Sequence, residues 1–485
     1  MQETSRHLRQ SPVVLAIATL LGTGTASAQT AAASAALPTV TVTSDWLGAP
    51  TPASARKHPG ARTVLTGDEL TESGSRTLED ALRQVPGLTV ADESGTGILP
   101  NIGVRGLNPL RSEQVLLLQD GIPMTLAPYG QTGASLFPLT LQAVQAVDVA
   151  RGGVAVHYGP NNVGGVINFV TKRIPTERSF TANHTVSVAR SGRVLSDSYA
   201  RLGGFVGESF GLQVQANAIE GQGERAHSKT SVRNLSLDAE WFPTDRTDLK
   251  AGVQYYTTRN ELPGALTPRA YAQDREQSTR PLDRFDGDTT RAHLIATHRL
   301  SSGAEVQWKN FGHRSERIFA FGNAASADAA STVRQSSPRN FRVYGTEPSV
   351  SLDIAGPVRQ KLMAGVRYMR EEVDYKVDAT NLATGAYTVP RDWRFENDAY
   401  AAYVSDTFSL LDGRLKVTPG VRHENVRLAY RNNAAGTETN DTTKDWLPGL
   451  DIGWQATDAL FLFANAHRSL RPVQFTQITF GGDMA

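Results

Sequence analysis

The stretch that decides the fold runs from residue 102 to residue 172 and contains four short motifs: IGVRGLNP (102–109), QDGIP (119–123), APYGQTG (127–133) and YGPNNVGGVINFVTK (158–172). Between and within them, runs of β-forming residues at 115–119, 144–149 and 165–171 alternate with glycine-rich turns. Asp120-Gly121 lies between two apolar runs, which is a strong signal for a β-hairpin. The pattern predicts a tightly turned α/β domain of about 110 residues, which we place at 61–176.

Bulk composition narrows the class of protein. The chain has 485 residues, which is long for one compact domain, and a net charge of +1. This near-neutral balance gives no reason to expect a nucleic-acid partner. The absence of cysteine excludes disulfides and thiolate metal sites. Mean hydropathy is −0.31, and beyond the N-terminus no apolar run approaches the ~18 residues of a membrane helix. A soluble protein and a transmembrane β-barrel, whose strands are half polar, both fit these values.

Two segments precede the α/β domain. Residues 1–28 have a basic start, an apolar core and an Ala-Ser-Ala ending, which is typical of a secretory signal peptide cleaved near Ala28. Residues 29–60 are rich in Ala, Ser, Thr and Pro, so we expect a periplasmic linker. Within the linker, TVTVT (39–43) can extend as a strand and add to the edge of a partner's sheet. A β-prone piece of linker is the alternative.

From residue 177 to residue 485, strand-like runs are joined by connections that alternate between long and short. Long loops are expected at 259–288, 317–340, 376–397 and 431–445. Apolar residues fall on one strand face at 249, 251, 253 and 255, and again at 362, 364, 366 and 368. A period of two with an apolar and a polar face predicts about 13 membrane-spanning strands. A soluble β-sandwich alternates similarly but has no reason to make every second connection long.

The four motifs, in this order and followed by such strands, resemble the TonB-dependent outer-membrane receptors, and within that family the ferric citrate receptors. The resemblance implies a transmembrane antiparallel β-barrel with an N-terminal α/β plug domain, in the outer membrane of a Gram-negative bacterium. Plugged barrels usually have about 22 strands. We therefore expect the barrel to be incomplete and the chain, which ends at Ala485, to be truncated at its C-terminus.

The resemblance also implies partners and a ligand. The box that contacts TonB, energised by ExbB and ExbD, would be Thr39, Val40, Thr41, Val42 and Thr43. The ligand would be ferric citrate or a related ferric siderophore, whose iron is already wrapped in its chelator. The protein then needs no cofactor and no iron ligands of its own.

Candidate binding residues follow from the chemistry of carboxylates. The chain carries no H-E-x-x-H, P-loop or G-x-S-x-G motif and its ten histidines are scattered, so we expect no enzyme and no metal site. Arginine recognises carboxylates with a bidentate fork. The candidates on the plug apex and in the outer loops are Gln131, Tyr129, Arg269, Arg280, Arg284, Arg339 and Arg391, with Arg275 in the same loop as the first three arginines. Ordinary loop charge paired with nearby Asp and Glu is the alternative for each arginine.

Two plug arginines, Arg105 and Arg151, precede glycines at strand ends. By resemblance, such arginines hold the plug to barrel carboxylates, so we assign them a structural role. Gly133 stands where the ferric citrate receptors often have a second polar residue, which leaves the ligand preference open. A receptor for another siderophore or for cobalamin, and a truncated remnant that does not transport, are the remaining alternatives. A passive porin has no use for a plug.

Overall fold

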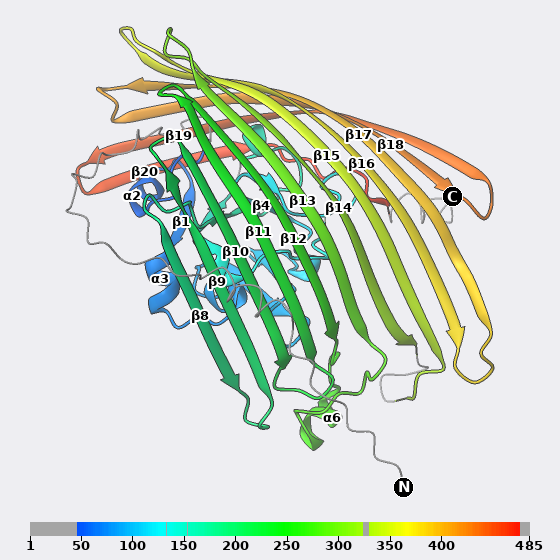
Figure 1. The fold of residues 1–485 in the computed structure, drawn as a ribbon. Helices are drawn as coiled ribbons and strands as arrows, with labels where there is room; N and C mark the ends of the chain where they lie inside the picture. Colours follow the sequence, from blue (N-terminus) through cyan, green and yellow to red (C-terminus); the bar gives the residue numbers. More distant parts are fainter. Residues whose placement is uncertain (1–45, 132, 153, 324–328, 476–485) are drawn as a thin grey trace, which may run out of the picture. The chain divides into compact units, whose positions relative to one another are not determined.

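The computed structural model describes residues 46–131, 133–152, 154–323 and 329–475, which belong to one compact unit spanning Val40–Ala485. An α/β domain of short strands, called the plug below, and a 13-stranded sheet make up these residues (Figure 1). The expected signal peptide at 1–28 and the expected TonB box at 39–43 lie outside the described residues. In the ranges given above, no helix is long and apolar enough to cross a membrane.

A five-stranded sheet forms the centre of the plug, in the order β1-β6-β7-β4-β5. β4 runs parallel to β7, and the other neighbours are antiparallel. The Val, Leu and Ile runs of β4 and β7 are buried on both faces, as expected for continuous apolar strands. The elements are β1 (Ala61–Thr66), β2 (Leu88–Asp92), β3 (Pro100–Val104), β4 (Val115–Gln119), β5 (Ile122–Pro123), β6 (Val144–Arg151), β7 (Gly165–Thr171), α2 (Pro52–Arg56), α3 (Gly67–Glu72), α4 (Leu78–Leu82), α5 (Ala155–Tyr158), and the short 3₁₀ helices η1 (Leu110–Ser112) and η2 (Leu141–Ala143).

The turn between β4 and β5 confirms the hairpin signal at Asp120-Gly121. Both residues have positive φ angles, 51° and 77°, as a two-residue type I′ turn requires. The Asp120 carboxylate accepts hydrogen bonds from the Thr171 backbone N–H (2.9 Å) and hydroxyl (2.8 Å), which ties the turn to β7. Thr77 caps α4 as its sequence predicts, because its hydroxyl accepts a hydrogen bond from the Asp80 N–H at 3.1 Å.

The plug's packing extends further toward the N-terminus than the expected start at residue 61. Leu47 is 4% exposed within an apolar cluster, and Trp46 stacks on His157 with 3.9 Å between ring centroids. α2 follows, with a reciprocal capping box between Thr51 and Ser54. The expected linker therefore contains a helix. Its composition conceals the helix because one turn depends on caps rather than on apolar periodicity.

A buried ion pair joins β1 to β6. Arg62 donates from Nε and Nη2 to the two carboxylate oxygens of Asp148 at 2.8 and 2.6 Å, and the side chains are 2% and 1% exposed. Arg62 also donates to the Leu47 carbonyl at 2.7 Å. The pair therefore connects the N-terminal segment, the edge strand and the centre of the plug sheet.

The large sheet has 13 strands, each hydrogen-bonded to the next in sequence from β8 to β20, and all neighbours are antiparallel. This confirms the expected wall of about 13 antiparallel strands. The strands are β8 (Ser179–Val188), β9 (Val194–Val206), β10 (Phe210–Gln222), β11 (Lys229–Thr244), β12 (Thr247–Glu261), β13 (Arg284–Arg299), β14 (Glu305–Asn323), β15 (Val333–Ile354), β16 (Arg359–Asn381), β17 (Tyr387–Leu410), β18 (Leu415–Asn432), β19 (Thr437–Thr457) and β20 (Leu460–His467).

The strand connections give the sheet two distinct ends. The turn end has short links such as 207–209, 245–246 and 411–414, and the loop end has the connection at 262–283, which contains α6 (Pro268–Gln273). Along the strands the predicted period of two is confirmed. Val253 and Tyr255 on β12 point outward and are 50% and 47% exposed, whereas Gly252 and Gln254 face inward and are buried. An apolar outer face and a polar inner face suit a wall between lipid and lumen.

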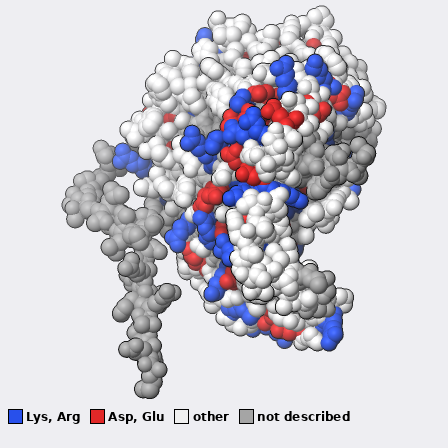
Figure 2. Space-filling view, turned by 90° about the vertical axis from the view of Figure 1, so that its right-hand side faces the viewer, with Lys and Arg blue, Asp and Glu red and all other residues white. Residues whose placement is uncertain are grey.

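Three of the expected loops are wrong. Residues 317–340, 376–397 and 431–445 are mostly strand. β14 continues to Asn323 and β15 begins at Val333, while β16 to β19 continue to connections at 382–386 and 433–436. Near these strand ends the outward residues are charged: Arg342, Arg370 and Arg394 form ion pairs with carboxylates of the same and neighbouring strands. Figure 2, which faces the right-hand side of Figure 1, shows basic and acidic side chains interleaved on the surface. These strands exceed the roughly 10 residues of a membrane span, so their ends lose the apolar alternation that marks a strand in sequence.

Replacing Arg62 tests the plug's buried ion pair. Arg62→Ala is expected to destabilise the plug by about 3–5 kcal/mol, because Asp148 would stay buried without its partner. Arg56→Ala, at an exposed position on α2, is the control and should leave stability unchanged. Denaturant titration of the purified protein, followed by protease cleavage within the plug, measures the difference. Equal midpoints for the two variants would contradict this role.

Glu79 on α4 makes plug stability depend on pH. Burial, reinforced by the nearby Asp92 and opposed by Arg83, raises the pKa of the Glu79 carboxyl from 4.5 to about 7. The folded plug then binds this proton more tightly than the unfolded chain, so the stabilisation is complete below pH 4.5 and is lost as pH rises through about 7. Glu79→Gln should remove this slope from protease-resistance profiles. Glu72→Gln, exposed on α3, should keep it, and an unchanged profile in Glu79→Gln would refute the assignment.

Candidate ligand-binding site

A row of inward-facing side chains crosses the large sheet near its loop end. Arg317 on β14 lies directly opposite Arg339 on β15. Arg339 lies opposite Tyr375 on β16, and Tyr375 lies opposite Trp393 on β17. Arg391 precedes Trp393 by two residues and therefore belongs to the same face of β17. Strand register, rather than proximity in sequence, brings these side chains together.

Arg317 and Arg339 are like charges on neighbouring strands, an arrangement that destabilises a sheet. Arg317 is 5% exposed, and it donates weakly to the Ser337 carbonyl (3.5 Å) and hydroxyl (3.4 Å). Among the described residues, no carboxylate lies within 4.0 Å of either guanidinium, and Nε of each has no hydrogen-bond partner. Two cations held together without a counter-charge form a site for an anion.

Aromatic rings hold these guanidinium groups in place. The guanidinium carbon of Arg339 lies 3.8 Å from the centroid of the Tyr375 ring, and that of Arg391 lies 5.1 Å from the Trp393 ring. Arg391 also donates to the Tyr375 hydroxyl at 3.2 Å. Stacking of this kind contributes about 0.5–2 kcal/mol and leaves the N–H edges of each planar fork available to a ligand.

The plug supplies a further cation. Arg111, on η1, shares the ring of Phe319 with Arg317, at 4.2 and 4.7 Å from the centroid. Burial lowers the pKa of the Arg111 guanidinium, and the Glu93 carboxylate, 2.7 Å away, opposes that shift. The plug and the wall therefore present their arginines to the same region.

The plug apex meets this row at Gln131. Arg339 donates from Nη1 to Oε1 of Gln131, and the Gln131 amide nitrogen donates to the Ser135 hydroxyl at 3.0 Å. Gln131, Arg339 and Arg391, three of the residues predicted from sequence, are thus brought together.

A carboxylate of the wall holds the backbone of the apex. Glu371 on β16 accepts hydrogen bonds from the N–H groups of Tyr129 (2.8 Å) and Gly130 (2.9 Å), one with each oxygen. The Asn397 side chain donates to the same carboxylate at 2.9 Å. Glu371 is 0% exposed. A movement of Gln131 must therefore disturb this contact one residue away.

Tyr129 faces the wall rather than the row of arginines. Its side chain is 1% exposed, and its hydroxyl donates to Glu424 on β18 at 3.1 Å. Burial raises the pKa of this hydroxyl, and the charge of Glu424 adds to the shift. The structure makes Tyr129, a residue predicted to bind the ligand, a link between plug and wall.

The arginines of the third outer loop lie apart from the row. Arg269 is exposed on α6. Arg280 pairs with Asp283 at 2.9 Å, and Arg284 pairs with Asp286 at 3.6 Å. Arg280 and Arg284 therefore have neighbouring carboxylates, which is the alternative considered for them.

The two plug arginines expected to hold the barrel have other surroundings. Arg151 donates to partners that all lie in the plug: Ala61, Thr63 and Pro86. Arg105 is exposed beside Gly152. Within the described ranges, neither has a wall carboxylate at ion-pair distance. Glu371 and Arg367, which donates to the Tyr158 carbonyl at 3.0 Å, are among the wall residues that contact the plug instead.

Sequence analysis missed Arg111, Arg317, Tyr375 and Glu371. Arg317 and Tyr375 lay at or beside expected loop boundaries, so their strand face was not considered. One signal was available, because His313, Ser315 and Arg317 follow one another at the strand spacing of two. In the part of the chain that the structure describes, no cluster of three or more His, Cys, Asp or Glu side chains is placed to hold a metal ion.

Comparison with known families agrees with this architecture. Residues 54–166 match the family model described as the TonB-dependent receptor plug domain, and residues 157–484 match the TonB-dependent receptor-like β-barrel. The chain belongs to the TonB-dependent receptor family. Its members are outer-membrane receptors rather than enzymes, and the plug and barrel wall described above are its two parts.

Solved structures agree with the assignment. The receptor is similar to the ferric citrate transporter FecA in its unliganded form, with 31% identity and a TM-score of 0.85 over 92% of this chain and 68% of that one. It shares the fold of the ferric yersiniabactin receptor FyuA from Yersinia pestis (18% identity, TM-score 0.65, 84% of this chain and 63% of that one). The same holds for the ferric preacinetobactin receptor BauA from Acinetobacter baumannii (15%, 0.68, 83% and 62%).

Two adjacent glutamates test the hold on the plug apex. Glu371→Gln leaves one acceptor oxygen for two backbone N–H groups, and a lost buried hydrogen bond of this kind costs about 1–3 kcal/mol. We expect the apex to open about tenfold more often, since about 1.4 kcal/mol is tenfold. Glu372→Gln, which changes an outward carboxylate paired on the outer face, is the matched control.

The measurement uses the absence of native cysteines. Ser135→Cys places a thiol at a buried position, 3% exposed, beside the apex. Its maleimide labelling rate reports apex opening. Faster labelling in Glu371→Gln alone is expected, and equal rates in the two glutamate variants would show that Glu371 does not hold the apex.

Proposed function

We propose that this receptor takes up a ferric hydroxycarboxylate complex, ferric citrate in the first instance, across the outer membrane with energy supplied through TonB. The observation that carries the proposal is the pair of guanidinium groups of Arg317 and Arg339 at the plug apex, neither of which has a carboxylate within 4.0 Å among the described residues. The similarity to FecA, at 31% identity, supports the same ligand class.

The chemistry of the ligand fits this arrangement. Citrate wraps iron in carboxylate and hydroxyl oxygens, and the oxygens turned away from the metal keep negative charge. Arginine forks bind such oxygens in pairs, with charge-assisted hydrogen bonds about twice as strong as neutral ones. The iron then needs no ligand from the protein and travels as cargo within its chelator.

Ligand binding would act on the plug through Gln131. A carboxylate at Arg339 would compete for the N–H group that now bonds Gln131, and the amide of Gln131 can turn to the ligand. The apex backbone, held next to it by Glu371, would register the change. The box at Thr39–Thr43 would then engage TonB, and ExbB and ExbD would supply the force that moves the plug.

Alanine variants of the two facing arginines test this proposal. Arg317→Ala and Arg339→Ala should each weaken ferric citrate binding by roughly 10- to 100-fold, because hydrogen bonds to charged groups contribute about 1.5–3 kcal/mol. Arg269→Ala, on the exposed α6, is the control and should bind like the parent protein. Calorimetry on receptor purified from outer membranes measures all three.

Two results would overturn the ligand assignment. One is tight binding of cobalamin or of an uncharged siderophore with no heat from ferric citrate. The other is ferric citrate binding that survives both alanine substitutions and is lost in Arg269→Ala, which would move the site to the outer loop.

A further inference from the structure

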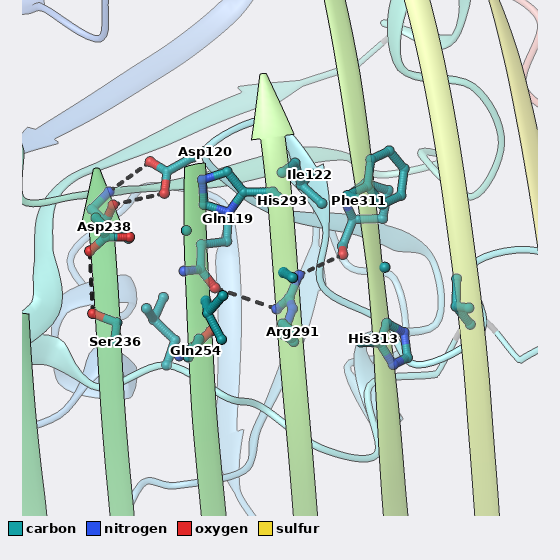
Figure 3. A pocket seen from close by; sticks show the side chains of 18 of the residues that line it. Gln119, Asp120, Ile122, Ser236, Asp238, Gln254, Arg291, His293, Phe311 and His313 are labelled. Carbon is teal, nitrogen blue, oxygen red and sulfur yellow. Dashed lines mark hydrogen bonds between the residues drawn. The ribbon is translucent and has the colours of Figure 1, made fainter. Parts of the chain in front are cut away.

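A cavity lies between the plug and the wall, on the turn-end side of the arginine row. It is bounded by the β4–β5 hairpin of the plug and by the inward faces of β10 to β16, and it is narrow, with about 60 Å³ open to the centres of water-sized molecules. Figure 3 shows Arg291 and His313 projecting into it from neighbouring strands, with the Gln119 side chain approaching from the plug. Half of the residues that line it are polar.

Arg291 is the guanidinium of this cavity, and its partners are neutral. It donates to the Pro123 carbonyl at 2.9 Å and to Oε1 of Gln119 at 3.4 Å. Both acceptors belong to the plug hairpin. Within the described residues, no carboxylate lies at ion-pair distance from Arg291. A charge removed from water without a counter-ion is costly, and an apolar side chain would fill the same space without that cost.

Strand register adds a second polar group to Arg291. His313 on β14 lies directly opposite Arg291, and Gln254 on β12 lies opposite on its other side. The His313 Nδ1 contacts the Ser315 hydroxyl at 2.9 Å, whereas Nε2 is buried without a partner in the described structure. A hydroxycarboxylate has both kinds of group that such a ring nitrogen can meet, a hydroxyl and a carboxylate oxygen.

The two carboxylates of the cavity have hydrogen-bond partners other than Arg291. Asp120 accepts two hydrogen bonds from Thr171, and Asp238 accepts from the Ser236 hydroxyl at 3.3 Å. Figure 3 shows these two carboxylates and the ring of His293 gathered at one side, with the Arg291 guanidinium and the His313 ring at the other. The cationic side of the cavity is therefore distinct from its acidic side.

The cavity continues the arginine row along one strand face. Arg317, Ser315 and His313 succeed one another on the inward face of β14, at the spacing of two that keeps side chains on one side. Four residues of strand correspond to about 13 Å. A ligand leaving Arg317 toward the turn end would therefore meet His313 and Arg291 next on this wall.

We propose that Arg291 and His313 form a second anion subsite, which receives the carboxylate-bearing iron complex after it leaves Arg317 and Arg339. Entry requires the β4–β5 hairpin to withdraw from Arg291, which exchanges the Pro123 carbonyl for a ligand carboxylate. The inference rests on the proposed function, because it assumes an anionic cargo. This subsite would place the path of the iron complex on the side of the plug that faces β12 to β14.

The alternative role for Arg291 is that of a clasp, a residue that only keeps the plug hairpin closed through its hydrogen bond to Pro123. The two roles differ in whether a cation on the facing strand β14 can restore uptake. In Arg291→Gln/His313→Arg the positive charge stays in the cavity but moves to the facing position on β14. If Arg291 forms a subsite, uptake requires a positive charge in the cavity, which either strand can supply. If Arg291 only holds the hairpin closed, uptake requires the hydrogen bond from β13 to the Pro123 carbonyl.

The test measures equilibrium binding and TonB-dependent uptake of radioactive ferric citrate in whole cells. Arg291→Gln should bind ferric citrate with unchanged affinity and take it up about tenfold more slowly, the change expected for about 1.4 kcal/mol of lost transit interaction. Adding His313→Arg should recover most of the rate. Arg299→Gln, at an exposed guanidinium on the same strand paired with Glu305, is the control and should transport normally.

Three outcomes would overturn the subsite. They are unchanged uptake in Arg291→Gln, a defect that His313→Arg does not relieve, and sensitivity of Arg291→Gln cells to large antibiotics without ligand, which a released clasp would cause. Failure of the parent receptor to bind ferric citrate would instead refute the proposed function, so the two claims fail separately.

Discussion

The placement of Arg317 opposite Arg339 without a counter-charge is the constraint on which the rest of this receptor depends. On the outer face of the same strands, Arg342, Arg370 and Arg394 each meet one or more carboxylates. On the inner face, the guanidinium groups of Arg317 and Arg339 stack on aromatic rings. Within the described residues, neither has a carboxylate at ion-pair distance. At this level of the wall, the outward arginines are therefore neutralised, whereas Arg317 and Arg339 on the inner face are not. That contrast is what an anion-binding site requires.

The second feature is the shared backbone of site and plug. Gln131 contacts Arg339, and the two residues before it donate to Glu371. These contacts with the wall come from three consecutive plug residues. The residues expected to bind the ligand are therefore next to the residues that hold the plug in place. A signal from ligand to plug then needs no long path of packed residues. The signal needs only a ligand that competes for the hydrogen bond between Arg339 of the wall and Gln131 of the plug.

Much of this architecture can be predicted from the sequence, and particular residues show where prediction stops. The Asp120-Gly121 turn, the Thr77 cap and the alternation around Val253 are local signals, and all three are confirmed. The strand ends within 317–340, 376–397 and 431–445 were expected to be loops, because their charged outward residues, which reflect the exit of the strands from lipid, interrupt the apolar alternation. The row itself joins residues 317, 339, 375 and 393, and only register brings them together. For the same reason the third-loop arginines, which look equivalent in sequence, could not be separated from Arg339 and Arg391 beforehand.

The most direct test of the central claim is a crystal structure of the receptor soaked with ferric citrate, with data collected at the iron absorption edge. We predict one anomalous peak between Gln131 and the guanidinium groups of Arg317 and Arg339, with citrate oxygens and no protein atom bound to the metal. An iron peak coordinated directly by a side chain, or one confined to the outer loop near Arg269, would contradict it.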